Sequence, residues 1–136
     1  MRRTLVLVCP LLLAVTLTAC GSTTTTAGFK GEQHEAAQTI ADLQNDATAA
    51  EQKKICANDL AVAVVRRLGG SKDCEKAIKN QLTEVDNLET SVKSVAIAAG
   101  ARTATAQVRS IREGKSVTST VSLVKEGGKW KIAGVG

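Results

Sequence analysis

The spacing of apolar side chains changes once along the chain, from a helical period to a strand-like one. Between about residues 32 and 54, apolar residues recur every three or four positions, which is the period of an amphipathic helix. The helical pattern ends near Asp86. Beyond it Thr, Val and Ser dominate, and apolar and polar residues alternate as in strands with one buried face. The pattern therefore predicts helices first and strands second.

Two further helices are predicted in the helical half. Asn58 or Asp59 is a candidate cap for the second helix, and the Gly69-Gly70 pair is typical of a helix C-terminus. Ser71 or Asp73 is a candidate cap for the third helix, which follows directly.

The second half predicts four strands, at about residues 88–98, 101–112, 116–125 and 129–135. The Gly127-Gly128 pair before the last strand is a strong hairpin signal, because glycine readily adopts the positive φ angles of two-residue turns. Helices followed by an antiparallel meander predict an α+β fold. Three N-terminal helices are expected to pack on one face of a four-stranded antiparallel sheet.

The first 19 residues have the composition of an export signal. Arg2 and Arg3 precede an apolar stretch that is too short for a comfortable membrane span, and small residues follow it. The ending Leu17-Thr18-Ala19-Cys20 resembles a bacterial lipobox. That resemblance implies cleavage before Cys20 and attachment of diacylglycerol to its sulfur, which would make the lipid bilayer a partner. A plain secreted protein with a chance cysteine is the alternative.

Three regions follow from this assignment. They are a lipoprotein signal peptide at 1–19, the lipidated Cys20 with a Thr-rich flexible tether at 20–31, and one folded domain at 32–136. The expected location is the extracytoplasmic face of the bacterial cell membrane.

Charge and aromatic content argue against nucleic acid as a partner. Loss of Arg2 and Arg3 with the signal lowers the formal net charge from +5 to +3, and the remaining charges are interspersed. Phe29 and Trp130 are the only aromatic residues, so the sequence offers no stacking platform for bases.

The export signal also decides how the cysteines are interpreted. Cys9 is lost with the signal and Cys20 is used for the lipid, which leaves Cys56 and Cys74. Outside the reducing cytoplasm disulfides form and persist, so we predict a structural disulfide between these two. Free buried thiols are the second hypothesis. A metal or redox site is disfavoured because no nearby cysteine or histidine completes a ligand set.

Several features together resemble the nuclear transport factor 2-like (cystatin-like cone) superfamily, and within it small lipoproteins of actinobacterial envelopes. They are Cys56 on a helix, Cys74 opening a later helix, the strand segment Ala104-Thr105-Ala106 and the closing hairpin Leu123–Ile132. The resemblance covers roughly residues 32–136. It implies a curved sheet that wraps a long helix, with a pocket at the open end of the cone. Some members are enzymes, and many only bind or scaffold.

The sequence carries little of the chemistry that the enzymes of this superfamily use, which is a pocket Asp or His often helped by Tyr. His34 is the one histidine, and it lies near the start of the first predicted helix, where a solvated role is favoured. There is no tyrosine, and the acids of the strand half fall at strand starts or turns. We predict no catalytic residue, no metal and no cofactor.

A binding pocket is harder to locate. Ser94, Ser119 and either Arg109 or Gln107 would line a cavity if the sheet curls, although ordinary strand-surface positions are the favoured interpretation. Trp130 is interpreted as a core anchor for the final hairpin. The ligand-binding residues are therefore left unknown.

The prediction for function is a membrane-anchored envelope lipoprotein with a non-catalytic binding or interaction domain. Its partner would be a small apolar ligand in the cone or an envelope protein. Two alternatives stay open, a small-substrate enzyme that uses the cone pocket and a homodimeric structural or regulatory module.

Overall fold

The computed structural model describes residues 26–82, 89–112 and 114–136. The predicted signal peptide, the lipobox with Cys20 and the first part of the tether lie outside the described residues, as does the predicted end of the third helix near Asp86. Within the described ranges the chain forms four α-helices, one π-helical turn and four strands.

The long helix α1 (Gly31–Thr48) opens the domain and is shorter than predicted. The prediction of one helix as far as residue 54 is wrong, because Ala50 adopts a positive φ of 55° and takes the chain out of the helical path. A short helix, α2 (Gln52–Lys54), follows and leads directly into the π-helical turn η1 (Ile55–Asp59).

The second predicted helix begins later than expected, since α3 spans Val62–Arg67. The prediction of Asn58 or Asp59 as its cap is wrong, because both residues belong to η1 and Asp59 is buried. Ala61 occupies the N-cap position without a side-chain hydrogen bond. The chain between η1 and α3 is extended instead, and it pairs with the sheet.

The turn after α3 is formed by glycine, as predicted. Gly69 and Gly70 have φ angles of 93° and 94°, which favour glycine and end the helix. The helix α4 (Ser71–Leu82) begins at once, and Ser71 and Asp73, the predicted caps, lie within its first turn.

The four strands form one antiparallel sheet in the order β1-β2-β3-β4. Their bounds are β1 (Glu89–Ile97), β2 (Thr103–Arg112), β3 (Lys115–Glu126) and β4 (Lys129–Val135), each within two residues of the prediction. Gly127 and Gly128 join β3 to β4 with φ angles of 57° and 80°, the conformation expected for a two-residue hairpin turn.

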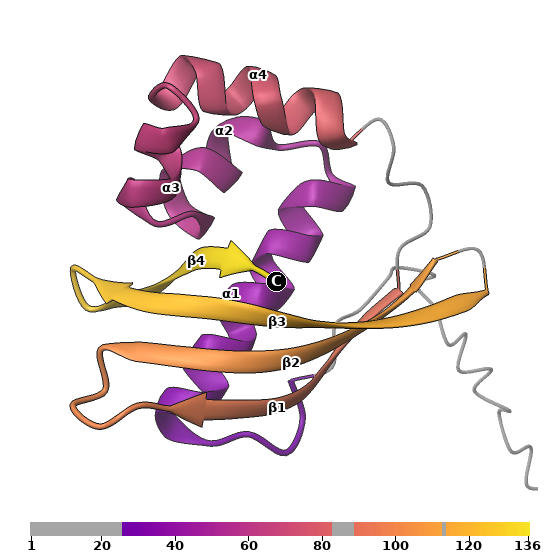
Figure 1. Cartoon of the computed structure of the whole chain (residues 1–136), viewed down its shortest axis with the longest axis vertical. Helices are drawn as coiled ribbons and strands as arrows, with labels where there is room; N and C mark the ends of the chain where they lie inside the picture. Colours follow the sequence, from indigo (N-terminus) through magenta and orange to yellow (C-terminus); the bar gives the residue numbers. More distant parts are fainter. Residues whose placement is uncertain (1–25, 83–88, 113) are drawn as a thin grey trace, which may run out of the picture.

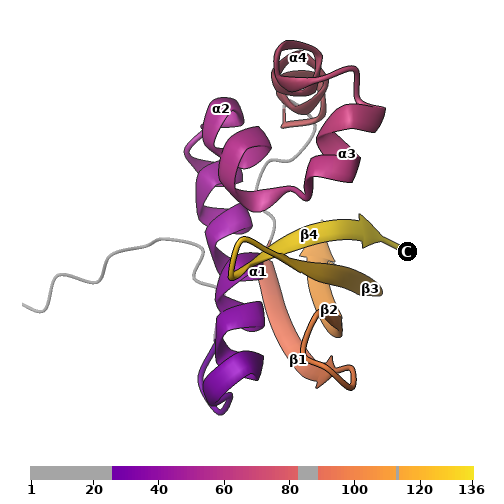
Figure 2. The same cartoon turned by 90° about the vertical axis from the view of Figure 1, so that its left-hand side faces the viewer.

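The helices and the sheet form separate layers, which confirms the predicted α+β fold class. Figure 1 looks onto the face of the sheet that no described helix covers, and Figure 2, turned by 90°, shows α1 running along the opposite face. The helices α3 and α4 stack beyond β4, and α4 packs mainly against α2, η1 and α3. We call α2, η1, α3 and α4 together the helical cap.

The space between α1 and the sheet is filled by side chains. Ala36 and Ala37 of α1 are fully buried, and their small size lets the helix approach the strands closely. Trp130 is only 3% exposed, which fits the predicted role of a core anchor. The inward-facing strand residues of this core are Val92, Val95, Ala104, Ala106, Val108, Val121, Leu123, Trp130 and Ile132.

Both edges of the sheet are engaged by other parts of the chain. On β1, Gln33 of α1 donates from Nε2 to the carbonyl oxygen of Val95 at 2.8 Å. The register of the β1–β2 pairing also shifts at Lys93, between Val92 and Ser94. On β4, the Ala61 N–H donates to the carbonyl oxygen of Ile132 at 2.8 Å. These contacts use backbone groups that an open edge would leave unpaired.

The predicted disulfide between Cys56 and Cys74 is confirmed. It ties η1 to the first turn of α4, with the two Cα atoms 6.1 Å apart. Both cysteines belong to the buried core, Cys74 without any exposure. The bond closes the segment that contains α3 and the glycine turn.

Candidate functional site

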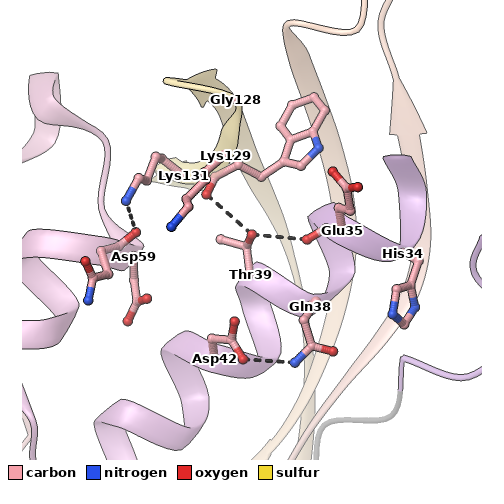
Figure 3. A pocket seen from close by; sticks show the side chains of 11 residues that line it. His34, Glu35, Gln38, Thr39, Asp42, Asp59, Gly128, Lys129 and Lys131 are labelled. Atoms are coloured by element: carbon pink, nitrogen blue, oxygen red, sulfur yellow. Dashed lines mark hydrogen bonds between the residues drawn. The ribbon is translucent and has the colours of Figure 1, made fainter. Parts of the chain in front are cut away.

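An open groove of about 620 Å³ lies between α1, η1 and the beginning of β4 (Figure 3). Its walls carry carboxylates, lysines and neutral polar groups together. The lining residues are His34, Glu35, Gln38, Thr39, Asp42, Asn58, Asp59, Gly128, Lys129, Trp130 and Lys131.

Secondary structure explains why these side chains meet. Gln38 and Asp42 are four residues apart on α1 and therefore share a face, and Gln38 Nε2 donates to Asp42 Oδ1 at 2.9 Å. Thr39, three residues before Asp42, contacts the edge of β4, where its hydroxyl lies 3.4 Å from the carbonyl oxygen of Trp130. Across the groove, Lys131 Nζ donates to the backbone carbonyl oxygen of Asn58 on η1.

Asp59 is the unusual residue of the groove. It is 5% exposed, and burial, followed by the negative charges of Asp46 and Asp42, raises the pKa of its carboxyl to about 7. A hydrogen bond with the Asp46 carboxyl acts in the same direction, while Lys131 partly opposes it. One of its oxygens, Oδ2, is buried without a hydrogen-bond partner among the described residues.

A second charged cluster joins the start of α1 to the end of β3 and the start of β4. Glu32 accepts hydrogen bonds from Lys125 Nζ at 2.5 Å and from Trp130 Nε1 at 2.8 Å, and the lysine lies 5.5 Å from the centre of the indole ring. These hydrogen bonds, from Lys125 first and Trp130 second, hold the pKa of Glu32 below its ordinary value. The cluster fastens the first turn of α1 to the sheet.

A smaller hollow of about 410 Å³ lies on the far side of η1. Its lining includes the apolar residues Cys56, Leu60 and Val65 and the cations Arg66 and Lys131. Lys131 borders both hollows, so the junction of η1 with β4 separates them.

Of the residues considered from sequence for catalysis or ligand binding, only His34 and Trp130 line the groove. Gln107 and Arg109 lie instead on the uncovered sheet face, where Gln107 Nε2 donates to Thr120 Oγ1 and Arg109 Nε to Ser116 Oγ. Ser94 is paired with Gln107 in the β1–β2 register. Neither serine proposed from sequence, Ser94 or Ser119, lines either hollow.

Sequence reasoning missed Asp59 as a buried acid. An Asn-Asp pair after a helical stripe is a normal helix-capping signal, and that signal concealed the residue. No group of three or more potential metal-ligating His, Cys, Asp or Glu side chains occurs in the described ranges. Nor does any helix in those ranges have the length and apolar content needed to cross a bilayer.

No protein-family model and no curated protein matches the chain. Two solved structures are similar to it. One is a de novo designed protein with a curved β-sheet, at 20% identity and a TM-score of 0.38, and the match covers 48% of this chain and 61% of the designed one. The other is a variant of the NTF2-like designed protein Rd1NTF2_05, at 17% identity and a TM-score of 0.49, with 74% of this chain and 95% of that chain covered. With both TM-scores below 0.5, neither likeness carries an argument about family or function.

Proposed function

We propose that this protein is a lipid-anchored envelope lipoprotein whose domain binds another envelope protein through the groove between α1, η1 and β4, without catalysis. The observation that carries the proposal is the contrast between a filled interior and an open polar groove. A small apolar ligand would need an empty apolar cavity, whereas Trp130 and the alanines of α1 occupy the space between helix and sheet.

The lining of the groove favours a polar, extended partner. Glu35 and Asp42 lie on the α1 side, while Lys129 and Lys131 lie on the β4 side. A protein segment that carries both signs of charge complements such a surface better than an apolar molecule does. The edge of β4 also brings backbone groups to the groove, and extended segments commonly use such groups.

The anchor is proposed from the signal peptide and the lipobox. The helix α1 starts at the end of the domain away from the helical cap (Figure 1), and a tether before Gly31 would therefore hold the helical cap away from the membrane. Substituting Cys20→Ala should release the protein from membranes, and membrane association that persists would contradict lipidation.

Site-specific photo-crosslinking in intact cells tests the binding proposal. A benzophenone amino acid at Lys129 or Gln38, which line the groove, should give a protein adduct. The same amino acid at Thr105, which is exposed on the uncovered sheet face, is the matched control and should give none. An adduct only from Thr105, or from no position, would overturn the groove as the binding surface.

Asp59 supports a second candidate function, that of a small-substrate enzyme. A carboxyl that titrates near neutral pH beside an open groove is suited to general acid–base catalysis. Incubation with envelope small molecules, followed by mass spectrometry, distinguishes the two candidates. A product that forms with the native protein but not with the Asp59→Asn variant would favour the enzyme.

A further inference from the structure

The outer side of α4 carries a row of lysines. Lys72, Lys76 and Lys79 are exposed, and their spacing of four and three residues places them within about 60° of one another around the helix. Along the chain, Asp73 and Glu75 lie between the first two of these lysines, so the sequence shows no basic run there. The helix therefore gathers charges that look interspersed in the sequence.

The opposite side of α4 is covered by the rest of the domain. Cys74 has no exposure and is fixed to η1 by the disulfide, and Ile78 and Leu82 pack against the core. Because that side is covered, the lysines point away from the domain. Figures 1 and 2 both show α4 at the outer end of the helical cap, where a large partner can reach it.

The described part of the chain leaves these lysines without a counter-charge. None of the ion pairs found there includes a residue of α4. The side chain of Asp73 lies against Gly69, and Glu75 is half-buried. Lys72 and Lys76 also stand four residues apart, where like charges destabilise a helix. The row therefore costs the fold some stability without a local interaction that offsets it.

The helical cap and α1 carry opposite net charges. Residues 52–82, which contain the helical cap, include seven basic and three acidic residues, a formal net charge of +4. The helix α1 has four acidic residues and no lysine or arginine, a formal net charge of −4. Such a separation attracts an anion to the helical cap and repels it from α1.

We propose that the lysine row of α4, formed by Lys72, Lys76 and Lys79, binds a linear phosphate-bearing polymer of the cell envelope. Lysine binds phosphate as a point charge, and the three positions span about 10 Å along the helix axis. A chain with phosphates at regular intervals can contact several of these ammonium groups at once, which a single phosphate cannot. None of the three lysines lines the groove, so this surface goes beyond the proposed function and does not depend on what the groove binds.

A polymer fits the lysine row better than the membrane that is proposed to hold the protein. The helix α1 begins at the end of the domain away from the helical cap (Figure 1), so an anchor before Gly31 leaves the lysines facing away from that membrane. This step rests on the proposed anchor, whereas the attraction between phosphate and lysine does not. Nucleic acid is disfavoured because Phe29 is half-buried and Trp130 buried, and the chain has no other aromatic residue on which bases could stack.

Fluorescence anisotropy of a labelled linear polyphosphate, titrated with the full chain in nonionic detergent, measures the binding without a bilayer. The variant Lys72→Gln/Lys76→Gln/Lys79→Gln should bind about 100-fold more weakly at low salt. The slope of log affinity against log salt should also fall by about 2, since each lost phosphate contact contributes about 0.7. Glutamine is close to lysine in helix propensity, and unchanged emission of Trp130 checks that the fold is retained.

A matched variant separates the position of the charges from their number. Lys30→Gln/Lys93→Gln/Lys115→Gln also removes three exposed lysines, none of them on the helical cap, and should lose far less affinity. Equal losses in the two triple variants, or no loss in the α4 variant, would overturn the proposal.

The acylated full chain, anchored in vesicles that contain phosphatidylglycerol, distinguishes the polymer from the bilayer. Polyphosphate binding should persist on these vesicles, because the lysine row faces away from them. Binding in detergent that disappears on the vesicles would assign the lysines to the bilayer and overturn the polymer as the partner.

Discussion

Removal of the Cys56–Cys74 disulfide should destabilise the domain mainly through its unfolded state. The bond closes a loop with a sequence separation of 18, which corresponds to about 3 kcal/mol in the chain-entropy model. Because Cys74 has no exposure and Cys56 very little, replacing both by alanine also removes buried packing, at about 1 kcal/mol per site. We therefore expect a loss of about 3 kcal/mol on reduction and about 4 to 5 kcal/mol for the double alanine variant.

Urea unfolding followed by tryptophan fluorescence measures both quantities. Trp130 is the single tryptophan and is buried in the core, so its emission reports global unfolding. Comparing oxidised protein, reduced protein and the Cys56→Ala/Cys74→Ala variant separates the cross-link from the packing, because reduction keeps both sulfur atoms. The slope of free energy against urea should also rise without the cross-link, since the unfolded chain then exposes more surface.

The reasoning is refuted if reduction lowers the free energy of unfolding by less than about 1 kcal/mol, well below the loop-closure value. A large loss on reduction with no further loss in the alanine variant would contradict only the packing part. In that case the two sulfur sites would have collapsed around the smaller side chains.

Three further substitutions test the core, the turn and the charged cluster. Leu123→Ala, at a fully buried strand position, should lower the free energy of unfolding by about 2 to 5 kcal/mol in the same urea assay. Gly69→Ala should lower the thermal midpoint, because φ is 93° there and the added Cβ would lie 2.7 Å from Asp73 Oδ2. Gly70→Ala is the control: it also has a positive φ but open space around the added Cβ, so its loss of stability measures the effect of φ alone. Because the pKa of Glu32 is lowered in the folded state, ionised Glu32 stabilises the fold at pH values above its ordinary pKa of 4.5. The urea midpoint of the unmodified protein should therefore fall when the pH is lowered below 4.5, and the midpoint of Glu32→Gln should fall less.

The strands could be predicted because their signals are local. Alternation along β2 and the Gly127-Gly128 pair require only neighbouring residues, and the four strands lie where the pattern puts them. The end of α1 could not be predicted in this way. Ala50 turns the chain at a positive φ, with no glycine to announce it, because packing of the following segment against α1 and α4 compensates for the strain.

The same difference applies to the chemistry. The disulfide could be predicted from the expected export signal and from the number of cysteines, and neither argument needs the fold. The raised pKa of Asp59 depends first on burial and then on the charges of Asp46 and Asp42, which lie more than ten residues away along the chain. The sequence pattern predicted a capping residue at this position. The burial of a side chain is a property of the tertiary structure, so neighbouring residues alone could not indicate it.

The engaged backbone groups at the two sheet edges matter if the proposed lipid anchor gathers many copies on one membrane. Lipoproteins that share one membrane diffuse in two dimensions, where copies meet far more often than at the same amount in solution. A strand with free backbone groups would then invite pairing between neighbours. Gln33 on the β1 edge and Ala61 on the β4 edge occupy such groups. Each edge therefore has at least one backbone group that a neighbouring copy cannot use, which disfavours strand pairing between crowded domains at those positions.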